Sequence, residues 1–369
     1  MVSYGTADGR RQTAVAVNPS PTLGGGVGVG AVSPLLTVGN ITTVINARKR
    51  VLRAVDNVSF SVGRGEILGL VGESGCGKSM TALSIMRLLP PAAFVATGTI
   101  EFDGRDLLKL SAREMRRVRG NDIAMVFQEP MTALDPAFTV GSQITEVVRA
   151  HDSVGNEQAM SRAIRMLDRL GIPNASQRVH DYPHQFSGGM RQRVMLALAL
   201  VMNPKLLLAD EPTTALDVTI QAQILDLIAE LRAELGLSVV LITHNLGVVN
   251  EIADRVAVMY AGEIVETGSV AEIFANPRHP YTQGLLKSMP YLKTREKTLH
   301  VIPGRVPELW AMPVACRFAA RCPNRIAPCV ETHPELERNE SYHELRCYNP
   351  TPIPTNSAME SAENASNGV

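Results

Sequence analysis

Long hydrophobic runs are missing from this sequence of 369 residues. The longest, Val194 to Met202, is far short of the roughly 18 residues that indicate a membrane span. An excess of one charge is missing too, because Lys plus Arg and Asp plus Glu both total 36, so overall charge does not argue for a nucleic-acid partner. At 45% hydrophobic residues, the chain can still bury a full core in one large domain with an appendage, or in two domains.

Cysteine is scarce, and its five copies do not form the even set typical of secreted proteins, so we predict a reducing cytosol. Residues 1–34 carry only three charges and show neither a clear apolar signal segment nor a cleavage site. We interpret them as a disordered leader, and residues 351–369, rich in Ser, Asn, Glu and Pro, as a disordered tail.

The most informative stretch runs from Gly72 to Ser79 and fits the pattern Gly, four residues, Gly-Lys-Ser. It follows an apolar run typical of a buried strand and precedes a helical segment, which is the context that a phosphate-binding loop requires. Glycines allow backbone N–H groups to surround a polyphosphate, Lys78 adds a charge, and Ser79 can hold Mg²⁺. The alternative is a glycine-rich turn that binds nothing. The predicted nucleotide contacts are Gly72, Ser74, Gly75, Cys76, Gly77, Lys78, Ser79 and Met80.

Polar side chains end three further apolar runs that we interpret as strands. Gln128 ends one run, where its amide could orient water or a metal ion. Asp210 and Glu211 end the next, and ligands collect at such strand ends in parallel sheets. One carboxylate could bind Mg²⁺ while the other polarises water. His244 ends the last run, although a histidine in that place is more often structural.

Ser187, Gly188 and Gly189 stand where a helix would begin, which makes them a second possible anion site or simply a capped helix. Asp217 follows the carboxylate strand. Helical periodicity between Gly141 and Gly171, continuing to about residue 200, indicates a helical insertion in the sheet.

In this order, the motifs resemble the ATPase domain of ABC transporters over residues 35–268. The resemblance implies an α/β P-loop NTPase fold with a mixed sheet, binding ATP and Mg²⁺. It implies that Asp210 holds Mg²⁺ with Ser79, that Gln128 is the Q-loop residue near that ion, and that Glu211 is the general base. It further implies that His244 is the switch, Asp217 the D-loop residue, and Ser187 to Gly189 the signature that closes on the opposite subunit's nucleotide.

Three positions depart from the family pattern. Phe186 replaces the usual Leu before the signature serine, and Met190 replaces the usual Gln after the glycines. No aromatic stands near Ile45, where one normally stacks on adenine, so we expect loose base selectivity.

Beyond the cassette the chain carries the segments Asn276 to Thr282, Ile302 to Pro307 and Cys316 to Pro323. Through these segments residues 269–350 resemble the C-terminal extension of dipeptide and oligopeptide importer ATPases, a subfamily that includes nickel and glutathione importers. The resemblance implies a peripheral protein on the cytoplasmic face of the inner membrane. Its implied partners are a second, related ATPase subunit, two transmembrane permeases and an extracytoplasmic peptide-binding protein. A chromosome or repair protein would need long coiled-coil heptads and a ribosome-binding factor two cassettes, and neither feature is present.

Four cysteines gather in the extension, at Cys316, Cys322, Cys329 and Cys347. Four thiolates suit zinc or an iron–sulfur cluster, whereas the alternative is small buried side chains with a disulfide. The resemblance implies a [4Fe–4S] cluster. With no substrate pocket evident in the sequence, our hypothesis is that such a cluster braces the tail. We expect the tail to fold back and bring Cys347 beside the other three.

Overall fold

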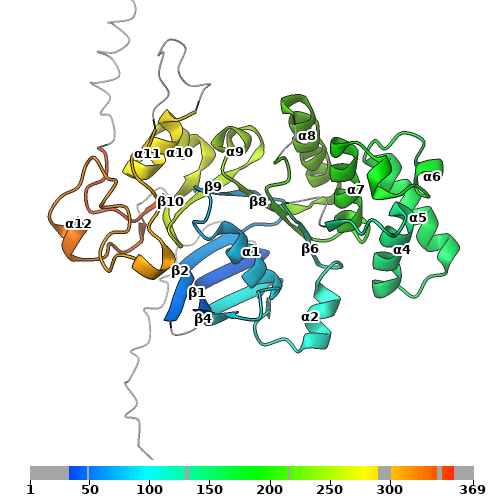
Figure 1. The fold of residues 1–369 in the computed structure, drawn as a ribbon, viewed down its shortest axis with the longest axis horizontal. Coiled ribbons are helices and arrows are strands. Elements are labelled where there is room, and N and C mark those ends of the chain that lie inside the picture. The colour runs from blue at the N-terminus through cyan, green and yellow to red at the C-terminus, as the bar shows by residue number, and fades with distance from the viewer. Residues whose placement is uncertain are drawn as a thin grey trace, which may run out of the picture. The chain divides into compact units, whose positions relative to one another are not determined.

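The computed structural model describes residues 33–47, 50–128, 133–214, 217–289, 301–338 and 343–352. The predicted leader and the predicted tail lie almost entirely outside these described residues. The described residues from Pro34 to Pro352 belong to one compact unit (Figure 1).

The first strands form an antiparallel sheet in the order β2-β1-β4-β5. Its strands are β1 Leu36–Ala47, β2 Arg50–Val62, β4 Ala93–Phe102 and β5 Arg105–Asp106. One face of β1 and β2 is apolar and buried, in the alternating pattern that the sequence predicts. The buried face packs against α1 and the main sheet, so the antiparallel sheet supports the start of α1.

The main sheet has the order β11-β12-β10-β9-β3-β8-β7-β6. Strands β6, β7, β8, β3 and β9 run parallel, and β10 pairs antiparallel with β9. The bounds are β3 Ile67–Val71, β6 Ile123–Val126, β7 Leu206–Asp210, β8 Ser238–Thr243, β9 Arg255–Tyr260 and β10 Glu263–Ser269. Every residue of β3, β7 and β8 is buried, because helices or the second sheet cover both faces. The predicted mixed α/β sheet is confirmed.

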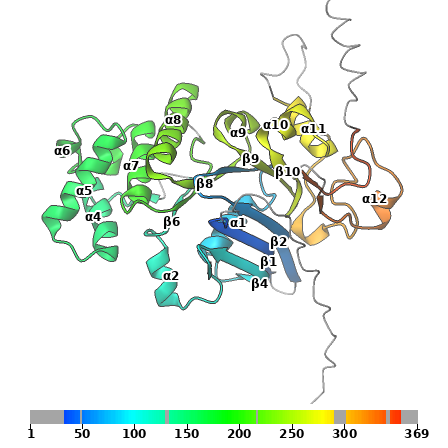
Figure 2. The ribbon, with the colours of Figure 1, turned by 180° about the vertical axis from the view of Figure 1, so that it is seen from behind.

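Helices occupy both faces of this sheet, with α9 on one side and α1 on the other (Figures 1 and 2). A group of helices lies beside β6 and occupies the residues predicted to form a helical insertion. The helices up to β9 are α1 Lys78–Met86, α2 Ala112–Val118, α4 Val140–His151, α5 Asn156–Arg169, α6 Ala175–Arg178, η1 Pro183–Gln185, α7 Gly188–Leu200, α8 Val218–Leu235 and α9 Leu246–Ile252.

The C-terminal extension joins the opposite edge of the main sheet. Its elements are α10 Val270–Ala275, α11 Pro280–Lys287, η3 Leu309–Ala311, α12 Pro328–Glu331, β11 Glu337–Arg338 and β12 Glu344–Leu345. Strand β10 ends at Ser269, so the domain boundary expected at Gly268 falls inside this strand. Strand β12 of the extension pairs with β10 and adds to the same sheet. Phe318 packs edge-on against Tyr260 of β9, with ring centroids 5.2 Å apart. None of the helices in the described part of the chain is long and apolar enough to cross a membrane.

Candidate functional site at the carboxyl ends of the parallel strands

The loop between β3 and α1 has a backbone that only glycine accommodates at two positions. Gly77 has φ 108°, and a Cβ atom there would lie 2.6 Å from the carbonyl oxygen of Ala54. At Gly72 a Cβ would lie 2.1 Å from the carbonyl oxygen of Met259. Both contacts are with backbone, so the loop has no room for a larger residue.

Lys78 opens α1 and folds back over the loop that precedes it. Its Nζ donates to the carbonyl oxygens of Gly72 at 2.7 Å and Glu73 at 3.1 Å. The side chain is buried, and its ammonium group lies 3.8 Å from the sulfur of Cys76. Burial raises the pKa of the Cys76 thiol, so this cysteine is a neutral packing residue in the loop.

Asp210 ends β7 beside the start of α1. Its side chain is buried, and burial raises its pKa, as does the neighbouring charge of Glu211, whereas a hydrogen bond from Ser79 lowers it. The carboxylate oxygen Oδ1 has no hydrogen-bond partner among the described residues. A buried carboxylate with a free oxygen beside a serine hydroxyl fits a hard cation such as Mg²⁺.

Glu211 is the most constrained side chain of the site. Its Oε2 accepts from Gln128 Nε2 at 3.0 Å and from Thr214 Oγ1 at 2.7 Å, and its Oε1 lies 3.1 Å from His244 Nδ1. Burial raises the pKa of Glu211, but the Thr214 and His244 hydrogen bonds outweigh burial, and the net shift is downward. The carboxylate is therefore ionised and oriented from two sides.

The backbone at Glu211 is also unusual. Its φ is 48°, in the left-handed region, and its N–H donates to the carbonyl oxygen of Ile242 at 2.8 Å. Such a conformation costs about 1–3 kcal/mol at a residue other than glycine and is concentrated at functional sites. Sequence reasoning missed Thr214, although its place three residues after Glu211 in a turn could have suggested the contact.

A cavity lies over the loop, lined by Ile45, Ala54, Ser74, Gly75, Gly77, Lys78, Ser79, Met80, Gln128, Glu211 and Leu309. These residues unite the predicted phosphate loop with Gln128 and Glu211. Ile45 lines the cavity, and none of the described lining residues is aromatic. Leu309 comes from the C-terminal extension, and no local signal in the sequence could have identified it.

The signature residues lie elsewhere. Ser187 caps α7, its Oγ accepting from Met190 N–H at 3.4 Å, and both Ser187 and Gly188 are exposed. Phe186 is buried under the Arg178 guanidinium, which lies 5.5 Å above its ring, so the departure from Leu is accommodated by packing. Asp217 caps α8 by accepting from Ile220 N–H at 2.9 Å. These residues are absent from the described lining of the cavity.

Cys347 lies near enough to the other three cysteines of the extension for their thiols to affect its own, and the Cys316 N–H donates to the Cys329 carbonyl oxygen at 3.2 Å. Burial, and to a smaller extent the neighbouring thiols of Cys322, Cys316 and Cys329, raise the pKa of Cys347 to about 11. All five cysteines are free, which excludes the disulfide alternative in this structure. Over the described ranges, however, no group of three or more His, Cys, Asp or Glu side chains is arranged to hold a metal ion. The expected tetrathiolate geometry is therefore not formed.

Comparison with known proteins places these features in a family. Residues 55–214 match the ABC transporter family, and residues 265–329 match the C-terminal region of oligopeptide and dipeptide transporters. The dipeptide transport ATP-binding protein DppD of Bacillus subtilis is 49% identical over 315 residues, which cover 85% of this chain and 94% of DppD. The chain belongs to the ABC transporter ATPases.

Two further likenesses agree with this assignment. The oligopeptide transport ATP-binding protein OppD of Bacillus subtilis is 49% identical over 319 residues, covering 86% of this chain and 89% of OppD. Among solved structures, the dimeric ATP-binding cassette MJ0796 bound to ADP and phosphate has a TM-score of 0.58 and 27% identity, covering 64% of this chain and 98% of the cassette. This ABC ATPase therefore has the cassette fold and the extension found in peptide transporter subunits.

Proposed function

We propose that this ABC ATPase hydrolyses ATP to energise the import of dipeptides or oligopeptides through a membrane transporter. The observation that carries hydrolysis is the Glu211 carboxylate, ionised and held by Gln128, Thr214 and His244 at the rim of the phosphate-loop cavity. The names of the relatives and the matched C-terminal region support peptides as the transported class.

In this proposal Lys78 and the loop N–H groups hold the phosphates, while Glu211 accepts a proton from the attacking water. Gln128 and His244 keep the carboxylate turned toward the cavity. Ser79 and Asp210 would hold Mg²⁺, with Gln128 beside it, and the bound ion would offset charge on the phosphates.

The test of hydrolysis is Glu211→Gln, which keeps the shape of the side chain and removes the base. We expect retained ATP binding and a roughly 10²–10⁴-fold lower turnover, the usual contribution of a positioned base. Lys78→Ala is the matched contrast and should weaken nucleotide binding itself. Wild-type turnover of Glu211→Gln in the assembled transporter would show that another group is the base.

The proposed assembly pairs this chain with a second, related cassette on the cytoplasmic face of the inner membrane. Two permeases and an extracytoplasmic peptide-binding protein complete it. A strain lacking this chain should lose growth on di- or oligopeptides supplied as the sole source of a required amino acid. Growth lost only when nickel or glutathione is limiting would assign the transporter to those solutes instead.

The tail cysteines support a second, narrower proposal, that they hold a structural [4Fe–4S] cluster, or zinc in its place. The four tail thiols are free, which supports it, although among the described residues no three of them are arranged to hold a metal ion. Anaerobically purified protein should then be brown, with iron and sulfide in about equal amounts. Cys76→Ser should leave the colour unchanged because Cys76 lies in the phosphate loop. Metal-free protein with four titratable tail thiols would refute both versions.

A further inference from the structure

Arg321 of the extension forms a two-pronged ion pair with a residue of the phosphate loop. Its Nη1 lies 2.6 Å from Glu73 Oε2 and its Nη2 lies 2.9 Å from Glu73 Oε1. Arg321 is only 7% exposed, and its guanidinium lies 5.7 Å from the Tyr260 ring centroid. The Glu73 pair raises the pKa of Arg321 above its usual value, so this arginine is always charged. A paired, planar arginine of this kind is a rigid anchor.

Glu73 is well placed to transmit that anchoring to the bound phosphates. Its carbonyl oxygen and that of Gly72 both accept from Lys78. Its N–H donates to the hydroxyl of Tyr281 at 2.9 Å, which comes from α11. The extension thus holds Glu73 through its side chain and its backbone, and Glu73 in turn holds Lys78.

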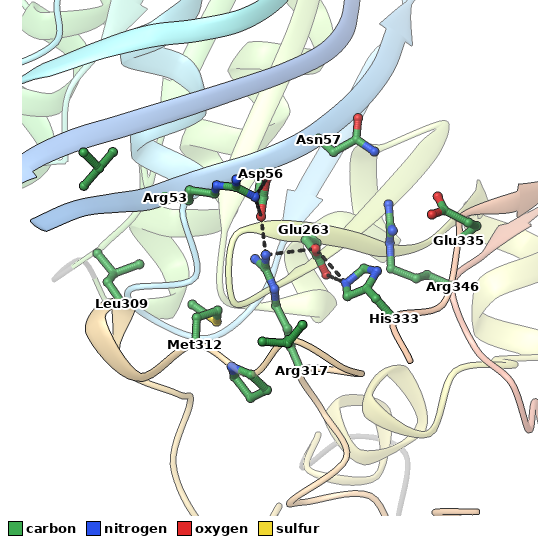
Figure 3. A pocket seen from close by; sticks show the side chains of 13 residues that line it. Arg53, Asp56, Asn57, Glu263, Leu309, Met312, Arg317, His333, Glu335 and Arg346 are labelled. Atoms are coloured by element: carbon green, nitrogen blue, oxygen red, sulfur yellow. Dashed lines mark hydrogen bonds and ion pairs between the residues drawn. The ribbon is translucent and has the colours of Figure 1, made fainter. Parts of the chain in front are cut away.

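A second arginine holds the other side of the same loop. Arg317 pairs with Asp56 and, at 3.1 Å, with Glu263, and Figure 3 shows it between these carboxylates. Its Nη1 donates to the carbonyl oxygen of Ala261 at 2.6 Å. The next residue, Gly262, donates to the carbonyl oxygen of Cys76 at 2.8 Å, so Arg317 fixes the turn on which the loop rests.

Charge gives the Arg321 pair a role beyond packing. A glutamate in a loop that binds polyphosphate carries the same sign as the ligand and repels it. A guanidinium bonded to both carboxylate oxygens offsets that charge while holding the loop in place.

We propose that Arg321 is a positioning residue of the nucleotide site, which neutralises Glu73 and sets the phosphate loop, so that the extension is a working part of the ATPase. This inference rests on the proposed binding of ATP by the loop.

The experiment compares Mg–ATP and Mg–ADP affinities of the full chain in four forms: wild type, Arg321→Gln, Glu73→Gln, and the double variant. Arg321→Gln should bind ATP about tenfold more weakly, within the range usual for coupling between sites, and ADP less so. The double variant should regain most of this loss, because the charge left unpaired by the first change is gone. Arg325→Gln, an exposed arginine of the same extension, is the matched control and should bind as wild type.

Hydrogen exchange gives a measurement that does not depend on one variant folding well. In Glu73→Gln, amides of residues 72–78 should exchange faster while those of β7 and β8 stay protected. In the assembled transporter, Arg321→Gln should raise KM for ATP more than it lowers kcat, and Arg321→Lys should restore part of the affinity.

The results distinguish failure of the proposed ATP binding from failure of the proposed role of Arg321. No binding of ATP by the wild type would overturn the proposed function itself. The role of Arg321 would be overturned if the wild type and Arg321→Gln bound ATP with equal affinity. It would also be overturned if the double variant regained no affinity and the loop amides of Glu73→Gln exchanged at the wild-type rate.

Discussion

Two helices of this protein begin with glycine-rich segments that leave backbone N–H groups available, yet their surroundings differ. At the start of α1, Lys78 is buried, and Gln128 and Glu211, which follow the neighbouring strands β6 and β7, complete a cavity. At the start of α7, Ser187 and Gly188 are exposed to solvent. A Cβ at Gly188 would meet nothing within 4 Å, whereas one at Gly77 would meet backbone at 2.6 Å.

From this difference we propose that the chain contains one complete phosphate site and one half-site. The loop before α1 has its partners within the chain, including Glu73 and its arginine from the extension. At the signature before α7, no other described residue joins the open N–H groups to complete a site for a ligand. A second cassette supplying the ligand from outside would use that surface, as in the assembly proposed above.

The largest effect that separates the two sites should come from Ser187→Arg. An arginine there places a long side chain on the surface expected to meet the partner's nucleotide. ATP affinity of the isolated chain should stay unchanged, because the cavity over the phosphate loop is elsewhere. Turnover in the assembled transporter should fall roughly 10²-fold or more, as when a group that stabilises transition-state charge is lost.

The control is Ser187→Ala, which removes the cap of α7 and should cost about 1 kcal/mol of stability with ATP affinity unchanged. The half-site interpretation fails if the isolated chain, shown to be monomeric, hydrolyses ATP at the rate of the assembled transporter.

Gly77→Ala should be the next largest change and should act on folding. The new Cβ would meet the Ala54 carbonyl in a left-handed backbone region, so we expect about 3 kcal/mol of destabilisation and loss of ATP binding. Gly188→Ala is the matched variant at the other helix and should leave the unfolding free energy within about 0.5 kcal/mol. Denaturant unfolding of both would check this, and equal losses would contradict the comparison.

A somewhat smaller effect, on folding stability, should appear when the pH is lowered, and only on the α1 side. His279 is buried, and burial lowers its pKa to about 4, partly offset by Glu266. Because the unfolded chain binds this proton near pH 6.5 and the folded chain only near 4, stability should fall as pH drops through that interval, by at most about 3 kcal/mol.

His279 caps α11, which carries Tyr281 to the phosphate loop, so acid should loosen that loop before it affects α7. The variant His279→Asn retains a capping side chain. Its unfolding free energy should vary less between pH 7 and pH 5 than that of the wild type. An identical pH dependence in both proteins would assign the effect to other groups.

Local patterns predicted much of the fold and the residues of the site. The apolar runs before Gly72, Gln128, Asp210 and His244 are β3, β6, β7 and β8, and a short continuous apolar run is a local signal of a strand buried on both faces. Parallel strands bring their carboxyl ends to one edge, so Gln128, Glu211 and His244 could be expected to meet. In the structure, Gln128 and His244 both contact Glu211.

The sequence alone also determined the family, because glycine, lysine and carboxylates at these spacings follow from phosphate chemistry. Only tertiary structure decided how the extension takes part. Leu309 in the nucleotide cavity, the Arg321 pair with Glu73 and the β12 strand on β10 all join residues far apart in the chain. Such contacts depend on packing of whole elements, and no periodicity or spacing near either partner encodes them. The same reason applies to the four cysteines, whose convergence could be expected but whose geometry only the folded chain specifies.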